Sequence, residues 1–231
     1  QSANGAGLRQ EIMHDPVVKR VLVWSGWLRV SHASIGLSVL AQLLTGWLIA
    51  ESPSLAGTAL DIHYLASAVL IFGLVIRLAL MFAGKPNERL PALLPASFEL
   101  AAMASTLRCY FSFFRASLPG WYAHNPVWKP FYLLMYLVLV IMVITGVMIP
   151  ETSIALGFYL PSVHTFWAHV LLWLSALHVV SVIVHDYRKQ TTDISAMVNG
   201  YRLFLSDSNR VDAGIDESVQ LISPDSLKRR L

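Results

Sequence analysis

The sequence predicts an all-α membrane protein whose transmembrane helices form a single bundle. Of its 231 residues, 55% are apolar and only 13% are charged, whereas soluble domains carry about 25% charged residues. The mean hydropathy is +0.57. The net charge of only +3 argues against a nucleic-acid binder despite the basic pI of 9.1. The single cysteine, Cys109, permits neither an internal disulfide nor a cysteine metal cluster.

Four segments have the roughly 20 apolar residues that a helix needs to cross a bilayer. These spans are residues 21–50, 62–83, 131–149 and 162–184. The first holds the apolar run 30–50 and is expected to begin near Val21. No signal-peptide cleavage pattern follows it, which favours a permanent span. The predicted organisation is a segment 1–20, a bundle 21–204 and a polar, loosely held tail 205–231.

Residues 91–118 are partly apolar, but Glu99, Arg108 and Arg115 interrupt them. A charge inside the membrane costs about 2.5–3.5 kcal/mol on insertion scales. We therefore predict a cytoplasmic interfacial helix here rather than a fifth span. The side chains expected to touch lipid are Phe98, Leu107, Phe111 and Phe114.

The basic residues predict the orientation of the spans. The loops 51–61 and 150–161 contain no Lys or Arg and carry three acidic residues, Glu51, Asp61 and Glu151. The Lys and Arg residues instead flank the opposite ends of the spans, which predicts cytoplasmic termini. A fifth span would move Lys129 and the C-terminal basic cluster to the wrong side.

Histidines are unusually frequent in the predicted spans, which contain five of the eight: His32, His63, His164, His169 and His178. His164 and His178 are 14 residues apart, which is about 21 Å of rise and brings them within about 40° of one helix face. His63 shares the depth of His164, and His32 shares the depth of His178. The sequence thus predicts two histidine pairs at two depths.

Paired neutral imidazoles without carboxylates or thiolates suit haem iron with both axial positions filled. Bundle cores hold such cofactors between facing helices. A single intramembrane histidine could equally be a hydrogen-bonded core residue, but four at matching depths favour ligation. His169 lies about 180° from His178 around its helix and should face elsewhere, while His185 is expected at an interface.

Other residues obey the same geometry. Gly46 lies 14 residues after His32, where a missing side chain would let a porphyrin approach the backbone; ordinary helix packing is the alternative. Arg77 and Arg29 are candidates to neutralise haem propionates, although Arg77 could instead snorkel to the headgroups. His124 and Arg77 are candidates for a quinone pocket, or His124 could shape the helix start at residues 125–126.

Five stretches between residues 27 and 204 carry a family resemblance: RVSHASIGL, DIHYLASAVLIFGLVIR, AHNPVWKPFYLLMY, SVHTFWAHVLLWLSALHV and TTDISAMVNGYR. The chain resembles the b-type cytochrome subunit of membrane-bound nickel–iron hydrogenases. That family is grouped with formate dehydrogenase gamma subunits and bacterial cytochrome b561 proteins.

The resemblance implies two b haems between four helices, with axial ligands His32, His63, His164 and His178. It implies a bacterial inner-membrane subunit, not catalytic alone, that passes electrons from a partner to quinone. The expected partner is a hydrogenase-type iron–sulfur small subunit with its catalytic large subunit. Its docking surface would be the loops 52–62 and 150–163, with Trp47 and Tyr159 as aromatic anchors.

Three other functions stay open. A freestanding cytochrome b561-type quinol oxidase would keep the haems without this partner. A cytochrome b subunit of a formate or sulfur-compound oxidoreductase would have another donor. A haem-free transporter or structural anchor would use the histidines differently. A Ser/His/Asp set and a nucleotide-binding loop are both lacking in the sequence, which argues against an independent enzyme.

Overall fold

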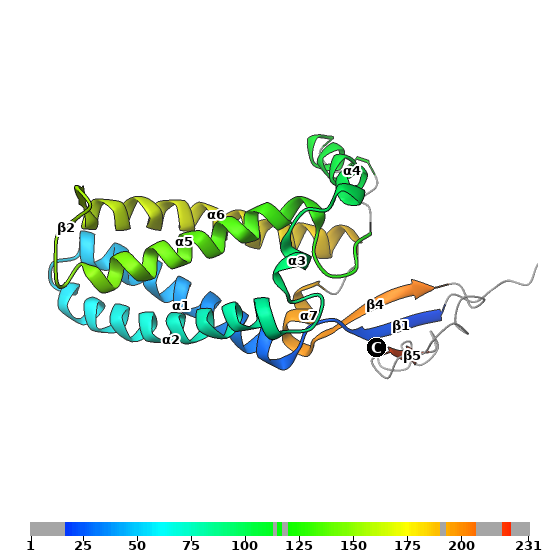
Figure 1. Cartoon of the computed structure of the whole chain (residues 1–231), viewed down its shortest axis with the longest axis horizontal. Coiled ribbons are helices and arrows are strands. Elements are labelled where there is room, and N and C mark those ends of the chain that lie inside the picture. Colours follow the sequence, from blue (N-terminus) through cyan, green and yellow to red (C-terminus); the bar gives the residue numbers. More distant parts are fainter. Residues whose placement is uncertain (1–16, 113–114, 117–119, 190–192, 207–218, 223–231) are drawn as a thin grey trace, which may run out of the picture.

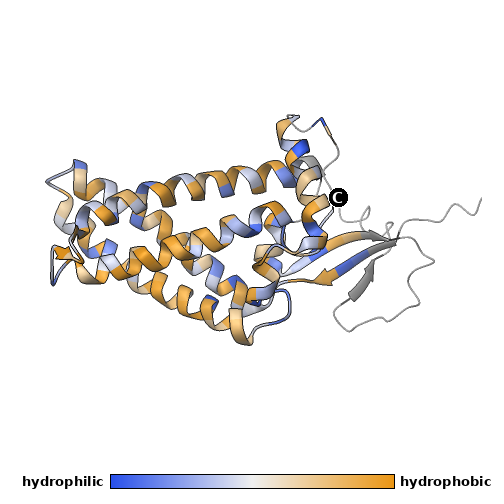
Figure 2. Ribbon diagram, turned by 45° about the horizontal axis from the view of Figure 1, so that its top comes forward, coloured by the Kyte–Doolittle hydropathy of each residue, from blue (hydrophilic) through white to orange (hydrophobic). Residues whose placement is uncertain are grey.

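Four long helices run side by side in the computed structural model, which describes residues 17–112, 115–116, 120–189, 193–206 and 219–222. They are α1 (Gly26–Glu51), α2 (Ala56–Ala83), α5 (Lys129–Met148) and α6 (Leu160–Lys189) (Figure 1). Apolar residues dominate their length (Figure 2). Each contains a segment long and apolar enough to cross a membrane. The predicted helical membrane bundle is confirmed.

Helices α1 and α2 approach each other closely because α2 carries a glycine at their contact. The Ser31 hydroxyl donates to the Gly73 carbonyl at 2.9 Å. A β-carbon on Gly73 would lie 2.9 Å from the β-carbon of Ser34, so a side chain there would force the helices apart. These two helices therefore form a tight helical hairpin, and α5 and α6 form the second one.

An aliphatic core fills the middle of the bundle. It draws on all four long helices through Val39, Leu70, Leu74, Val138, Leu139 and Leu171. In α6 the core residue Leu171 lies midway between His164 and His178 along the chain. The core therefore separates the two predicted histidine levels with side chains that carry no polar group.

Two helix starts differ from the predicted spans. Helix α1 begins at Gly26, not near Val21, because residues 17–22 are a strand and the Ser25 side chain caps the helix by accepting from the Leu28 amide. Helix α2 begins at Ala56, six residues before the predicted position 62, because only Ser52–Leu55 connects it to α1. Hydropathy indicates which part of a helix lies in the hydrocarbon core, but not the residue at which the helix begins. Helix α1 therefore begins later than predicted, and helix α2 begins earlier.

A small antiparallel sheet at one end of the bundle was not predicted. Its strands β1 (Val17–Leu22), β4 (Tyr201–Ser206) and β5 (Val219–Ile222) lie in the order β4-β1-β5. Strand β4 follows α7 (Asp193–Asn199) through Gly200, whose positive φ of 88° makes the turn. The sheet crosses the predicted boundaries 20/21 and 204/205, and residues 219–222 of the tail are paired with β1. The N-terminal segment and the tail are therefore joined.

The region between α2 and α5 is a series of short elements: α3 (Leu90–Leu93), the 3₁₀ turn η1 (Ser97–Glu99), α4 (Leu100–Phe111) and the 3₁₀ turn η2 (Pro126–Trp128). Residues 90–111 form a fifth segment that is apolar enough to span a membrane. However, the backbone is extended at Leu94 and Ala96, which breaks the segment. The 12 residues of α4 extend about 18 Å, short of the roughly 30 Å hydrocarbon core.

Helix α4 lies beside one end of the four long helices and is not part of their bundle (Figure 1). Three of the four residues expected on lipid, Phe98, Leu107 and Phe111, are exposed, and Phe114 lies outside the described residues. The Glu99 carboxylate pairs with Lys129 of α5 at 2.7 Å and so ties this segment to the bundle. The break and the exposure favour the interfacial interpretation over a fifth span.

A β-hairpin closes the opposite end of the bundle, where β2 (Ile154–Ala155) pairs with β3 (Phe158–Tyr159). Its two turn residues, Leu156 and Gly157, both have positive φ, 51° and 81°. We call the half of the bundle with this hairpin, His63 and His164 the hairpin end. We call the half with the three-stranded sheet, His32 and His178 the sheet end.

Candidate cofactor site

The four histidines singled out by their spacing lie in two facing pairs. At the hairpin end, the ring centroids of His63 of α2 and His164 of α6 are 6.4 Å apart. At the sheet end, those of His32 of α1 and His178 of α6 are also 6.4 Å apart. The fold thus brings together the residues that the sequence pairs, and it does so with the same separation at both ends.

This separation suits one metal atom between each pair of rings. A metal–nitrogen bond is about 2 Å and a ring nitrogen lies about 1 Å from its centroid, so two axial imidazoles place their centroids about 6 Å apart. Among the described residues there is no group of three or more His, Cys, Asp or Glu side chains that could hold a metal ion. A two-ligand site is what haem iron requires, because the porphyrin supplies the other four nitrogens.

Both histidines at the hairpin end make a hydrogen bond to a threonine of the preceding long helix. The Nδ1 atom of His63 is 2.9 Å from the hydroxyl oxygen of Thr45. The Nδ1 atom of His164 is 2.7 Å from that of Thr145. Because Nδ1 is occupied by these contacts, Nε2 of each ring is the nitrogen left to bind a metal.

Each of these threonines is followed by a glycine that lies against the same histidine. A β-carbon on Gly46 would be 3.9 Å from the His63 ring, and one on Gly146 would be 3.3 Å from the His164 ring. Gly46 therefore lies at the predicted level, and Gly146 is its counterpart in α5. The sequence reasoning missed Thr45, Thr145 and Gly146. The sequence signal that could have found them is a Thr-Gly dipeptide whose threonine lies 18 or 19 residues before each histidine of the hairpin end.

Aromatic side chains surround the pair at the sheet end. The Trp128 ring lies 6.3 Å from the His178 ring and the Tyr132 ring lies 6.0 Å from it, both close to edge-on. Within the described part of the chain, neither His32 nor His178 makes a side-chain hydrogen bond through a ring nitrogen. Each end therefore contains one imidazole pair, but the hairpin-end pair is held by hydrogen bonds and the sheet-end pair is surrounded by aromatic rings.

The sheet end also contains a buried guanidinium. Nε of Arg77 donates to the Tyr136 hydroxyl and one of its terminal nitrogens donates to the Glu88 carbonyl oxygen, each at 2.8 Å. The Glu88 carboxylate is fully buried and accepts from the amides of Ser25 and Lys85 instead. Among the described residues Arg77 thus has no carboxylate partner. Since buried charges are normally paired, this site suits an anionic group such as a haem propionate.

Arg29 supplies a second cation at this end. One of its terminal nitrogens donates to the Val198 carbonyl oxygen of α7, which links α1 to the sheet end. Its Nε is buried and has no hydrogen-bond partner within the described residues. The predicted propionate-binding role of Arg29 remains a prediction, and the free Nε gives it a structural basis.

His124 lies in a mainly apolar setting between Trp24, which precedes α1, and Tyr132 of α5, whose rings its own ring contacts. Burial is the main cause that lowers the pKa of His124 to about 4, and the nearby charges of Arg77 and Lys129 contribute to this shift. His124 is therefore neutral at pH 7, and it lies in the same neighbourhood as Arg77, as the predicted quinone pocket requires.

Two histidines lie outside the pairs. His169 is exposed, and its Nδ1 contacts the Thr165 carbonyl oxygen of its own helix. His185, which was expected at the membrane interface, is buried, and its Nε2 is 2.8 Å from the Tyr110 hydroxyl. That hydroxyl also accepts from Asn125, so it links α4 both to α6 and to the segment that precedes α5. The interfacial position of His185 remains a prediction.

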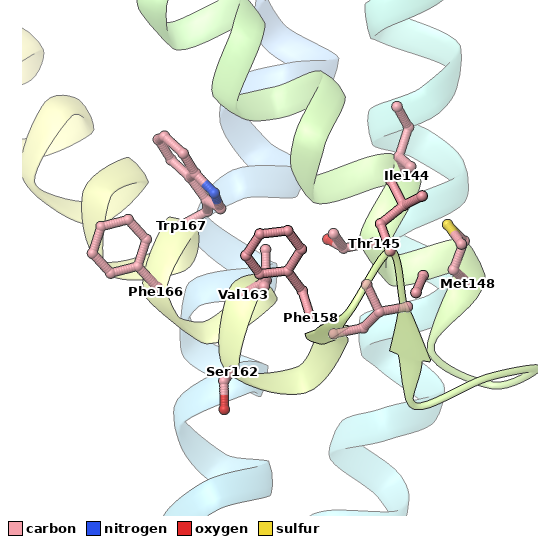
Figure 3. Close-up of a pocket in the computed structure, with 11 residues that line it drawn as sticks. Ile144, Thr145, Met148, Phe158, Ser162, Val163, Phe166 and Trp167 are labelled. Atoms are coloured by element: carbon pink, nitrogen blue, oxygen red, sulfur yellow. The ribbon is translucent and has the colours of Figure 1, made fainter.

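A cavity of about 580 Å³ lies at the hairpin end of the bundle, between α5, the β-hairpin and α6 (Figure 3). Its walls are almost wholly apolar; Thr145 and Ser162 contribute hydroxyl groups. None of the four paired histidines lines it. The cavity therefore adjoins the hairpin-end pair only through Thr145, whose hydroxyl contacts His164, and its walls suit an apolar chain rather than a charged ligand.

Helices that hold imidazole pairs at two membrane depths define a class of protein, the membrane cytochromes of the b type. The comparison with known families agrees: the prokaryotic cytochrome b561 family matches residues 23–200, which include all four long helices and all four paired histidines. The chain belongs to the prokaryotic cytochrome b561 family. This membership implies b-type haem and confirms the family suggested by the sequence motifs.

One relative is a probable Ni/Fe-hydrogenase B-type cytochrome subunit from Cupriavidus necator. It is 24% identical over 220 residues, which cover 81% of this chain and 88% of the relative. No solved structure matches the chain. The similarity thus extends over nearly the whole bundle.

Proposed function

We propose that this chain is a membrane-anchoring cytochrome subunit that binds two b haems and passes electrons between an extracytoplasmic iron–sulfur oxidoreductase and quinone. The observation that carries the proposal is the pair of equal 6.4 Å ring separations at the two ends of one bundle. Bound haem would supply one-electron chemistry between ferrous and ferric iron. The chain supplies the axial ligands and the distance between the two levels.

The aliphatic core between the levels excludes water from the path between them. The two histidines of α6 are separated by about 21 Å of helix rise, with Leu171 and its neighbours between them. Electrons would therefore cross most of the membrane in one step between the two sites. Arg29 and Arg77 would hold propionates at the sheet end, where both have buried nitrogen atoms aimed at no carboxylate within the described residues.

The proposed orientation places the hairpin end outside the cytoplasmic membrane of a bacterium and the sheet end inside. The basis is the absence of Lys and Arg from residues 51–61 and 150–161, together with the basic residues around the sheet end. Both termini are then cytoplasmic. α4 would lie on the inner surface, with the exposed Phe111 of α4 and Phe98 of η1 in the lipid.

The donor would dock at the hairpin end. The hairpin presents exposed apolar side chains, Ile154, Leu156, Phe158 and Tyr159, and α1 presents an exposed tryptophan, Trp47, towards the same end. Residues 52–62 and 150–163 together form the proposed docking surface. A relative described as a hydrogenase cytochrome subunit supports a nickel–iron hydrogenase as the donor, with its iron–sulfur small subunit at this surface and its catalytic large subunit behind it.

Quinone would react at the sheet end, near Arg77 and His124. Neutral His124 can accept a hydrogen bond through its unprotonated ring nitrogen, and Arg77 can donate hydrogen bonds to a carbonyl oxygen. Aromatic rings of Trp24 and Tyr132 line the same place. The proposed site thus combines an apolar wall with two polar groups, as small-molecule sites usually do.

The test is the haem content of the purified protein and its reduction by hydrogen. We expect two acid-extractable haems per chain, because the sequence has no Cys-x-x-Cys-His attachment motif. In the intact complex with its donor, hydrogen should reduce both. Haem that stays oxidised under hydrogen, with an active partner present, would exclude the hydrogenase and leave a formate or sulfur-compound donor. A chain without haem would overturn the proposal itself.

A further inference from the structure

We infer that Thr45 and Thr145 are positioning residues that fix both imidazoles of the His63–His164 pair and lower the midpoint potential of the iron bound there. The inference rests on the proposed function, since it assumes that this pair binds haem. It goes beyond that function by assigning two further residues and by predicting a difference between the two haem sites.

The hydroxyl geometry determines which ring nitrogen carries the proton. The Thr45 hydroxyl lies 2.8 Å from the Ala41 carbonyl oxygen, and the Thr145 hydroxyl lies 2.8 Å from the Ile141 carbonyl oxygen. A carbonyl oxygen can only accept, so each hydroxyl proton is donated to its helix backbone. The hydroxyl oxygen can then only accept from the histidine.

Each histidine must therefore carry its proton on Nδ1. The Nδ1–H of His63 donates to Thr45, and that of His164 donates to Thr145. In this neutral tautomer the lone pair is on Nε2, which is the atom that binds a metal. In each helical hairpin the first helix therefore orients the histidine of the second. Thr45 of α1 holds His63 of α2, and Thr145 of α5 holds His164 of α6.

The two Thr-Gly pairs place these hydroxyls in equivalent positions. Gly46 and Gly146 leave room for the ring beside the backbone, and the Gly146 contact is the tighter of the two. A larger residue there would push the ring away from the hydroxyl. The repeated arrangement on two different helical hairpins argues that the contacts are part of one site rather than two separate packing accidents.

An Nδ1–H bond to an acceptor makes an imidazole more basic and a better donor to iron. Better donation favours ferric iron, so both threonines should lower the potential at the hairpin end. Within the described residues, the sheet-end pair lacks such bonds. This difference makes the sheet-end site the better electron acceptor.

The experiment is a redox titration of single and double Thr→Val variants. Valine keeps the shape of threonine and removes the hydroxyl. We expect T45V and T145V each to increase the ferrous-to-ferric ratio of the hairpin-end haem severalfold at fixed potential, and the double variant about tenfold, which is 59 mV for one electron. The sheet-end component should not move. His63→Ala identifies the hairpin-end component by removing it.

Three controls separate the hydroxyl effect from structural damage. T45S and T145S keep the hydroxyl and should titrate like the wild type. T165V changes an exposed threonine next to His164 and should have no effect. Electron paramagnetic resonance of the oxidised protein should show an altered low-spin signal for one haem in the valine variants only, because the rings lose a restraint.

An unchanged hairpin-end potential in T45V/T145V, with both haems bound, would overturn the inference and leave the proposed function intact. If a valine variant loses the haem, retention in the matching serine variant supports the hydroxyl role. Loss in both would mean that packing, not hydrogen bonding, is needed, and would overturn the inference. A wild-type chain without haem at this pair would instead refute the proposed function.

Discussion

The hairpin end and the sheet end hold the same pair of side chains in different surroundings. Both pairs have ring centroids 6.4 Å apart. At the hairpin end two threonine hydroxyls hold the rings. At the sheet end aromatic rings surround the pair, and the same half of the bundle contains a buried arginine and a nearly buried ion pair.

This difference shows that the choice of cofactor and the properties of the bound cofactor depend on different residues. The imidazole pair decides which cofactor fits, and it is equal at both ends. The surroundings decide how that cofactor behaves and what can approach it. Charged and titratable groups gather at the sheet end, so changes of charge and pH should act there, whereas the hairpin end should respond to changes of hydrogen bonding and exposed apolar surface.

The largest expected effect comes from breaking the sheet-end ion pair. Lys129 and Glu99 are 2.7 Å apart, with side chains only 8% and 15% exposed. Lys129→Ala would leave a nearly buried carboxylate without its cation and should lower the free energy of unfolding by about 3–5 kcal/mol. Thermal unfolding in detergent measures this loss.

The matched control is the double variant Lys129→Met with Glu99→Gln, which removes both charges. It should recover most of the lost stability, because no uncompensated charge remains. Equal stability of Lys129→Ala and the wild type would show that water reaches Glu99. The buried charge of the sheet end would then be limited to other groups, such as Arg77 and Glu88.

Acid should destabilise the sheet end through His124. Its pKa is lowered to about 4 in the folded protein, against about 6.5 unfolded. The unfolded chain therefore binds more protons between these values, and stability should fall by about 3 kcal/mol as the pH falls from about 6.5 to about 4. His124→Gln should flatten this part of the pH profile of thermal unfolding. A profile identical to the wild type would exclude His124 as the cause.

The smallest expected effect is at the hairpin tip. Leu156 is 97% exposed and has a φ of 51°, a conformation that costs a side chain like leucine about 1–2 kcal/mol. Leu156→Asn should raise the stability of the isolated cytochrome by about 1 kcal/mol, because asparagine adopts this conformation more readily. The same change should reduce copurification of the donor if the tip is part of its docking surface. Unaltered copurification would place the contact elsewhere on the hairpin end.

The helical bundle and the two histidine pairs could be predicted from the sequence. Apolar length predicts membrane helices because the bilayer imposes it, and a spacing of 14 residues is enough to place His164 and His178 on one face of α6. The depths of His32 and His63 follow once the helices alternate in direction. These inferences need no knowledge of side-chain contacts.

The sequence could not predict what depends on contacts between distant segments. The sheet joins residues 17–22 to residues 201–206 and 219–222, and strands this short carry no sequence pattern that identifies their pairing partners. The contact between His185 and Tyr110 could not be predicted because the two residues are 75 positions apart in the chain. Thr45 and Thr145 were not predicted because threonines are common in membrane helices. Only their equivalent hydrogen bonds to His63 and His164 in the structure identify them.

The measurement that tests the central claim most directly is a redox titration of the four single His→Ala variants. If the rings pair as the structure arranges them, His63→Ala and His164→Ala should abolish the same haem component. His32→Ala and His178→Ala should abolish the other, with one haem left in every variant. Loss of different components in His63→Ala and His164→Ala would contradict the account, as would retention of two haems after any of these substitutions.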